Sequence, residues 1–242
     1  MKLEKIVSKY KNASSFIDWF EHTKGAYLTK YHYYWDVACL LSDIGNKNII
    51  NIVKGRGVGM TFMYAAYAAW MAQQGKKVLY VSHDNVRARE FIKTTDSISW
   101  YCSINRSENK LYFPFWDGKK EGCIQAVSYN NLSKGESADL IIVDEFAIFS
   151  NPGNALKALI PMAAYGKIII SSTPSSFDYS GSYIFEDLCN KHGYYHVPVF
   201  DESKANEMRK YYSGDLSAYN RECNALIDNG FMPDYIGVDD VN

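Results

Sequence analysis

Long apolar runs are the feature that the sequence most clearly lacks. No run approaches the ~20 apolar residues that a membrane-spanning helix requires. The charged N-terminus at residues 1–5 is not followed by an apolar core, so a secretory signal is not expected either. Cysteine is also scarce. The five cysteines are odd in number, are widely spaced and form no CxxC pair. This usage favours reduced thiols in a cytosolic protein over a disulfide framework.

Net charge is nearly absent from the chain as a whole, at −1, but it is unevenly distributed. Residues 1–135 carry 19 Lys and Arg against 11 Asp and Glu, whereas the remainder carries 7 against 16. A basic half can bind a polyanion, but scattered solvated charge would give the same count, so both interpretations stay open. The 242 residues, 47% of them hydrophobic, predict one large domain or one domain with a small appendage.

Short apolar runs alternate with helical patterns along the chain. Strands are expected at residues 48–53, 77–82, 140–143, 167–171 and 194–199, with a hairpin formed by 111–115 and 123–128 around a turn at 116–119. Helices are expected near residues 16–20, 33–41, 61–74, 84–97, 154–164, 181–191, 203–212 and 215–228. This alternation predicts an α/β fold with a largely parallel sheet, in which ligands bind at the carboxyl ends of strands.

A glycine-rich loop joins the first expected strand to the strongest helix, where a phosphate-binding P-loop belongs. It consists of Lys54, Gly55, Arg56, Gly57, Val58, Gly59, Met60 and Thr61. The glycines allow backbone N–H groups to approach phosphates, and Thr61 stands where a P-loop hydroxyl binds Mg²⁺. The usual pattern places a lysine at the position of Met60, which carries no charge. Lys54, at the opposite end of the loop, can supply that charge; the alternative is a glycine turn that binds nothing.

Two further strand ends carry polar groups. Four aliphatic residues at 140–143 are followed by Asp144 and Glu145, as in a Walker B strand. There the first acid holds Mg²⁺ and the second orients and deprotonates the attacking water. The strand at 167–171 ends in three hydroxyl residues, Ser171, Ser172 and Thr173, which are followed by a proline. Its hydroxyls can reach a phosphate, although an ordinary turn rich in Ser and Thr is the plainer interpretation.

Taken together, these three segments resemble the ATPase domain of the large terminase subunit of tailed bacteriophages, the motor that packages DNA. The order and spacing of KGRGVGMT, LIIVDEFAIF and IIISSTPSS match, over roughly residues 14–230. Lys134 and Gly135 resemble a basic-Gly element of the family. Some terminases carry a lysine at the front of the loop and another residue after its last glycine, as Lys54 and Met60 do here.

The resemblance implies a role for each matched residue. Lys54, Arg56 and the loop backbone would hold the phosphates of ATP, with Arg56 at the γ-phosphate as a second catalytic group. Thr61 and Asp144 would position Mg²⁺, and Glu145 would activate water. Ser172 and Thr173 match the coupling motif. Where many members have an adenine-reading glutamine, this chain has aromatic residues, so Tyr34 is expected to stack on the base.

The resemblance also implies the organisation and the partners. Residues 1–200 would form a RecA-like P-loop (ASCE) core with an N-terminal helical extension, and residues 201–242 a helical lid and linker toward a nuclease domain that this chain does not include. The expected activity is therefore Mg²⁺-dependent ATP hydrolysis without nuclease activity. The expected partners are double-stranded DNA, the portal protein of the procapsid and the small terminase subunit, in the host cytoplasm and not at a membrane.

Assembly and function leave alternatives open. Terminases work as rings, so an arginine of a neighbouring copy would complete the site; Arg87, Arg89 and Arg106 are the candidates, and the isolated domain is expected to be a monomer. A degenerate P-loop module that binds nucleotide or a capsid protein without hydrolysis would explain Met60. A helicase-like, DNA-dependent ATPase is the alternative among enzymes.

Overall fold

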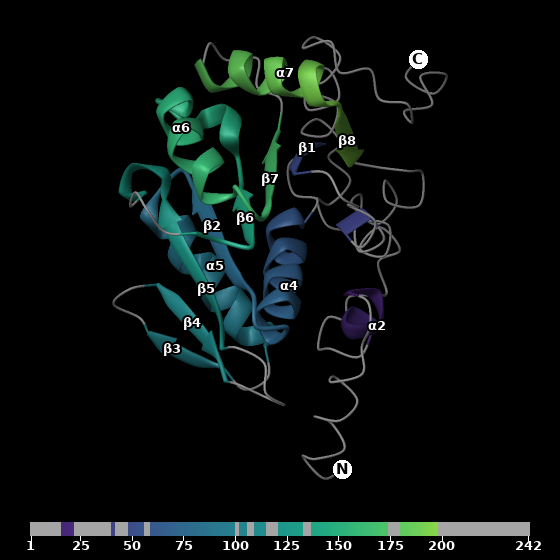
Figure 1. Ribbon diagram of the computed structural model, residues 1–242, viewed down its shortest axis with the longest axis vertical. Helices are drawn as coiled ribbons and strands as arrows, with labels where there is room; N and C mark the ends of the chain where they lie inside the picture. Colours follow the sequence, from purple (N-terminus) through teal and green to yellow (C-terminus); the bar gives the residue numbers. More distant parts are fainter. Residues whose placement is uncertain are drawn as a thin grey trace, which may run out of the picture.

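The computed structural model describes residues 16–21, 40–41, 48–55, 59–99, 102–105, 109–114, 121–132, 137–173 and 180–197 (Figure 1). Several sequence predictions lie outside these residues: most of the helix at 33–41, the hairpin turn at 116–119, Lys134 with Gly135, and the lid at 201–242. The domain boundary at residue 200 therefore stays a prediction.

The described elements follow the predicted alternation of strands and helices. In chain order they are α2 (Phe16–Glu21), β1 (Ile49–Lys54), α4 (Met60–Gln73), β2 (Lys77–Ser82), α5 (Asn85–Ile98), β3 (Ser103–Asn105), β4 (Lys110–Phe113), β5 (Gly122–Ser128), the 3₁₀ helix η2 (Tyr129–Asn131), β6 (Leu140–Val143), the 3₁₀ helix η3 (Phe146–Ile148), α6 (Pro152–Met162), β7 (Lys167–Ser172), α7 (Ser180–His192) and β8 (Tyr194–Val197). The predicted strands are confirmed, and β3 is a further strand that the sequence pattern did not indicate.

One eight-stranded sheet runs through the molecule in the order β3-β4-β5-β2-β6-β7-β1-β8. The strands from β5 to β8 in this order are parallel, whereas β4 is antiparallel to both β5 and β3. The register places Ile52 beside Ser171 and Val143 beside Ile170, so β7 separates β1 from β6. The carboxyl ends of β1, β7, β6 and β2 therefore meet at one edge, and the α/β prediction is confirmed.

Helices cover both faces of this sheet, which explains why its central strands are almost continuously apolar. One face, called the α4 face, packs residues such as Ile52 and Ile142 against α4 and α5. The opposite face, called the α6 face, packs Val53 and Val143 against α6 and α7. Because successive strand residues point to opposite faces, the position of a residue in its strand decides which core it enters.

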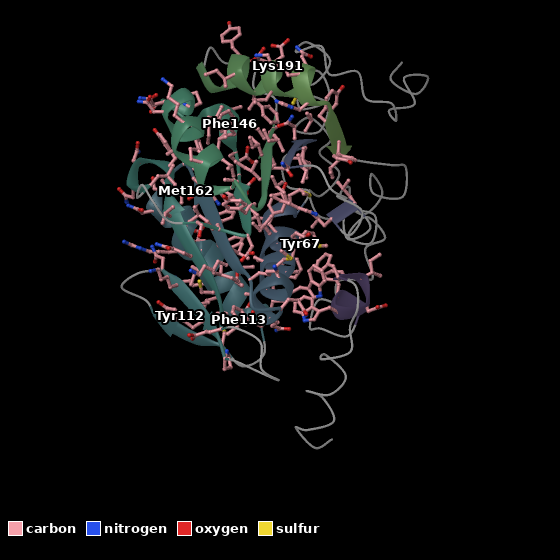
Figure 2. The ribbon with its side chains drawn as sticks, viewed as in Figure 1. Tyr67, Tyr112, Phe113, Phe146, Met162 and Lys191 are labelled. Carbon is pink, nitrogen blue, oxygen red and sulfur yellow. The ribbon has the colours of Figure 1, made fainter. Side chains whose placement is uncertain are left out.

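α4 is the central helix of the α4 face, and its residues 63–69 are all buried. It contacts the sheet, α5 and α2. Figure 2 shows Tyr67 on the side of α4 that faces α2, where its ring meets Phe16 edge-on with centroids 5.0 Å apart. Trp19 Nε1 donates a hydrogen bond to Gln73 Oε1 at 2.6 Å. These contacts anchor α2 to the helix that follows the glycine-rich loop.

The starts of the two helices on the α4 face follow simple backbone rules. α4 begins after Gly59, whose φ of 70° lies in the left-handed region that glycine adopts without a steric penalty. α5 begins after Asp84, whose carboxylate accepts a hydrogen bond from the backbone N–H of Arg87 at 2.7 Å. Among the described helices, none has the length and apolar character needed to cross a bilayer.

Candidate active site

Neighbouring strand ends bring a charged and hydroxyl-rich cluster together at the carboxyl edge of the sheet. Lys54 ends β1, Asp144 follows β6, and Ser171 lies in β7 between them. All of them are almost completely buried. Each continues the series of strand residues that point to the α4 face, where the first turn of α4 brings Thr61. The site is therefore built by strand order and residue parity.

One oxygen of the Asp144 carboxylate is held by two hydroxyl groups. Thr61 Oγ1 donates to Asp144 Oδ2 at 2.9 Å, and the phenol of Tyr80 in β2 donates to the same atom at 3.1 Å. Thr61 approaches from the loop side and Tyr80 from within the sheet. The two residues that were expected to position Mg²⁺ are thus joined by a direct hydrogen bond, and their role toward the ion stays a prediction.

The other oxygen, Oδ1, accepts a different set of donors. Ser171 Oγ lies 3.0 Å from it and the backbone nitrogen of Glu145 lies 3.1 Å from it. Lys54 Nζ is 3.3 Å away. A buried carboxylate needs such partners, because an unpaired charge in the interior is strongly unfavourable.

These contacts fix the charge states of the buried pair. Burial alone would raise the pKa of Asp144, but the Lys54 ammonium and the hydrogen bonds from Thr61, Ser171 and Tyr80 hold this pKa below its usual value. Burial alone would lower the pKa of Lys54, but the two carboxylates outweigh that effect and raise it. Both groups are therefore charged at neutral pH.

Glu145 lies at the mouth of this buried cluster. Its Oε1 is 2.5 Å from Lys54 Nζ, and its Oε2 accepts the backbone N–H of Thr173 at 3.3 Å. Its side chain is 31% exposed, so water can reach the carboxylate. Its backbone has a φ of 55°, a left-handed conformation that costs a non-glycine residue energy and that occurs often at functional sites.

The glycine-rich loop is described at its two ends. Gly55 and Gly59 flank the segment, and Met60 begins α4 with its side chain only 2% exposed in the core of the α4 face. The thioether therefore serves packing, whereas Lys54, at the start of the loop, contacts both acids. The predicted site residues Arg56, Gly57, Val58 and Tyr34 lie outside the described residues.

The two predicted hydroxyls after β7 lie in different surroundings. Ser172 points to the α6 face, where its Oγ accepts the backbone N–H of Ala147 at 3.0 Å and donates to the carbonyl of Thr173 at 3.2 Å. Thr173 lies beside Glu145, and its buried Oγ1 has no hydrogen-bond partner within the part of the chain that the structure describes. Nucleotide contacts of Ser172 and Thr173 stay predictions.

Sequence reasoning missed Tyr80, and it singled out Ser171 only as one of three strand-end hydroxyls; both residues hold Asp144. The signal that could have found them is the alternation of side chains between the two faces of a strand. Ser171 follows Ile169 by two positions, Tyr80 follows Val78 by two, and all four side chains belong to the α4 face. Applying this signal requires the strand order, which the sequence alone does not state.

Two of the three candidate arginines, Arg87 and Arg89, lie on α5. Arg87 is in the first turn of α5 and forms an exposed ion pair with Glu90 at 3.3 Å. Arg89 is exposed on the same helix, and Arg106 lies outside the described residues. Among the contacts of the described residues, none ranks Arg87 above Arg89.

The chemistry of the donors fits a divalent cation such as Mg²⁺. This ion prefers oxygen ligands, typically one or two carboxylates or hydroxyls together with phosphate and water. Thr61 Oγ1 and Asp144 Oδ2 already lie within 2.9 Å of each other, and Asp144 is ionised by its surroundings. Thr61 and Asp144 are therefore the residues that would hold the ion, through these two oxygens.

Comparison with known proteins places the fold. No protein-family model matches the sequence, and no curated protein does. Among solved structures, the large terminase of bacteriophage HK97 matches over 82% of this chain and 48% of its own, with 16% identity and a TM-score of 0.57. The large terminase of a thermophilic bacteriophage, solved in complex with ADP, matches over 73% of this chain and 47% of its own, with 14% identity and a TM-score of 0.51.

The same thermophilic phage protein in complex with ATP-γ-S matches at 14% identity and a TM-score of 0.51, over 73% of this chain and 46% of its own. The chain thus spans about half the length of the solved terminases it matches. By its fold, a mostly parallel sheet flanked by helices, the chain resembles the large terminases of phages.

Proposed function

We propose that the protein is a Mg²⁺-dependent ATPase that drives translocation of double-stranded viral DNA into a procapsid. The observation that carries this proposal is the cluster of Lys54, Thr61, Asp144 and Glu145. Its members come from separate segments and meet at the carboxyl edge of a P-loop sheet. A cation, a metal-binding hydroxyl and two adjacent acids are the groups that nucleotide hydrolysis requires.

The phosphate groups of ATP would be held by Lys54, Arg56 and the backbone of residues 57–61. Lys54 is the last residue of β1, so its ammonium group lies at the base of the loop and not on the following helix. Thr61 and Asp144 would hold Mg²⁺, which would supply positive charge to neutralise the phosphates. Ser172 and Thr173 would report the γ-phosphate to the rest of the domain.

Glu145 would act as the general base, because it is the acid of the pair that water can reach. Its Oε1 is occupied by Lys54 and its Oε2 by the N–H of Thr173. A phosphate oxygen that attracts Lys54 would free Oε1 to accept a proton from the attacking water. Nucleotide binding and base activation would thus be linked through one lysine.

The fold comparison supports both nucleotide binding and a role in a DNA-packaging motor. The large terminase of the thermophilic phage was solved with ADP and with ATP-γ-S. By analogy, this chain would work in a ring with the portal protein and the small terminase subunit in the host cytoplasm, with Arg87, Arg89 or Arg106 completing a neighbour's site. Tyr34 would stack on the base, and residues 201–242 would form the lid.

Steady-state phosphate release with ATP, measured with Mg²⁺ and with EDTA, tests this function. The proposal predicts release that needs Mg²⁺ and increases with double-stranded DNA. Nucleotide binding without any release would favour the degenerate binding module, which Met60 motivates. Release accompanied by separation of duplex strands would favour the helicase-like alternative.

A further inference from the structure

Both oxygens of Asp144 are held by side chains that come from the strands on either side of it. Tyr80 in β2 donates to Oδ2 at 3.1 Å, and Ser171 in β7 donates to Oδ1 at 3.0 Å. β2 and β7 are the two neighbours of β6 in the sheet, so each oxygen is tied to a different strand. Neither residue belongs to the loop or to the acid pair.

The phenol of Tyr80 has little freedom to move. Its ring stacks on Phe91 of α5 with centroids 3.6 Å apart and an angle of 5° between the planes. The side chain is only 2% exposed. A donor fixed in this way can fix its acceptor.

Ser171 is fixed by the sheet itself. Its Oγ also lies 3.3 Å from the carbonyl oxygen of Val143, the last residue of β6. Lys54 attracts the same oxygen, Oδ1, from 3.3 Å. Without fixed donors on each oxygen, the carboxylate could turn further toward the ammonium group and away from Thr61.

We propose that Tyr80 and Ser171 are positioning residues that hold Asp144 so that its Oδ2 and the hydroxyl of Thr61 receive the divalent cation of the nucleotide. This inference rests on the proposed function. Partners that orient a metal-binding carboxylate typically contribute about 10- to 100-fold in metal affinity or activity. The two residues act through Asp144 and touch neither phosphate nor metal.

The test measures ADP binding by calorimetry in EDTA and in Mg²⁺, for wild type, Tyr80→Phe and Ser171→Ala. The quantity of interest is the gain in ADP affinity that Mg²⁺ produces. We expect each substitution to reduce this gain about tenfold or more, while affinity in EDTA changes less than about twofold. Tyr67→Phe, which removes a phenol from the α2–α4 contact instead, should preserve the gain.

Each outcome decides a separate question. No gain in the wild-type protein would contradict the proposed function, and the inference with it. A wild-type gain that both substitutions retain would overturn the inference alone, as would an equal loss with and without Mg²⁺, which indicates a merely structural role. If Tyr80→Phe does not fold by circular dichroism, Ser171→Ala gives the same test on the other oxygen.

Discussion

The ammonium group of Lys54 lies 2.5 Å from Oε1 of Glu145, although the two residues belong to the ends of different strands separated by β7. The same nitrogen is 3.3 Å from Asp144. A lysine placed after the last glycine of the loop, at the position of Met60, would begin α4 instead of ending β1. The displaced lysine therefore brings the loop cation directly to the acid pair.

Replacing Glu145 separates binding from chemistry. Glu145→Gln keeps the shape but removes the base, so we expect nucleotide affinity to be retained and turnover to fall about 10²-fold or more. Phosphate release and ADP titration on the same preparation check this. Glu186→Gln, an exposed acid on α7, is the matched control. Wild-type turnover in Glu145→Gln would remove this residue from the mechanism.

Replacing Met60 affects stability more than chemistry, because its side chain is buried in the core of the α4 face. Met60→Ala should lower the free energy of unfolding by about 2–5 kcal/mol, the usual cost of such a cavity. Urea denaturation measures this loss. Turnover per folded molecule should fall far less than in Lys54→Ala, and a larger fall would give Met60 a role in the chemistry.

The buried ion pair predicts a window of pH stability. The lowered pKa of Asp144 stabilises the fold above the ordinary value of 3.8, and this contribution is lost as pH falls through the folded-state pKa. The raised pKa of Lys54 stabilises it below the ordinary value of 10.5, and this contribution is lost as pH rises through the folded-state pKa.

Unfolding of wild type and the double variant Lys54→Met/Asp144→Asn at several pH values checks this window. The free energy of unfolding of the wild type minus that of the variant should be constant from about pH 5 to 9. This difference should decrease below about pH 5 and above about pH 9. A difference that is independent of pH down to about pH 2 would mean that the carboxylate is not stabilised by its partners.

The basic first half predicts contact with DNA. If its cations line a groove, binding of a duplex should be independent of sequence and should weaken steeply as salt rises, because phosphate contacts release counterions. Fluorescence anisotropy with two unrelated duplexes at about 50 and 200 mM salt tests this. An affinity that is flat over this range, or no binding, would indicate that the excess charge is simply solvated.

The sequence predicted the strands and the acid pair because each is a local pattern. LIIV followed by two acids identifies β6 and its end without knowledge of any neighbour. The roles of Tyr80 and Ser171 were not predicted, because they depend on β2 and β7 flanking β6. β3 was missed because three residues carry too little periodicity to distinguish a strand from a loop.

Ser172 illustrates the same limit at one residue. A run of hydroxyls at a strand end gives no sign of which member faces the site. The register makes Ser171 the partner of Asp144 and turns Ser172 toward Ala147 of η3. A shift of one position along a strand moves a side chain to the opposite face of the sheet. Only the pairing of β7 with β6 therefore decides whether Ser171 or Ser172 faces the site.

We expect Lys54 to supply the cation that P-loops usually carry at the position of Met60. A charge-assisted contact of this kind contributes roughly 1.5–3 kcal/mol, equivalent to about ten- to a hundredfold in affinity. Lys54→Ala should therefore weaken ATP binding more than ADP binding, since the γ-phosphate adds charge. Lys93→Ala, which removes an exposed lysine on α5, is the matched control.

The most direct measurement is Mg²⁺-dependent phosphate release by wild type, Lys54→Ala and Lys93→Ala under identical conditions, with folding verified by circular dichroism. We expect wild type and Lys93→Ala to hydrolyse ATP and Lys54→Ala not to hydrolyse it. Wild-type turnover by a folded Lys54→Ala protein would contradict this expectation, because the phosphates would then be held without the strand-end lysine.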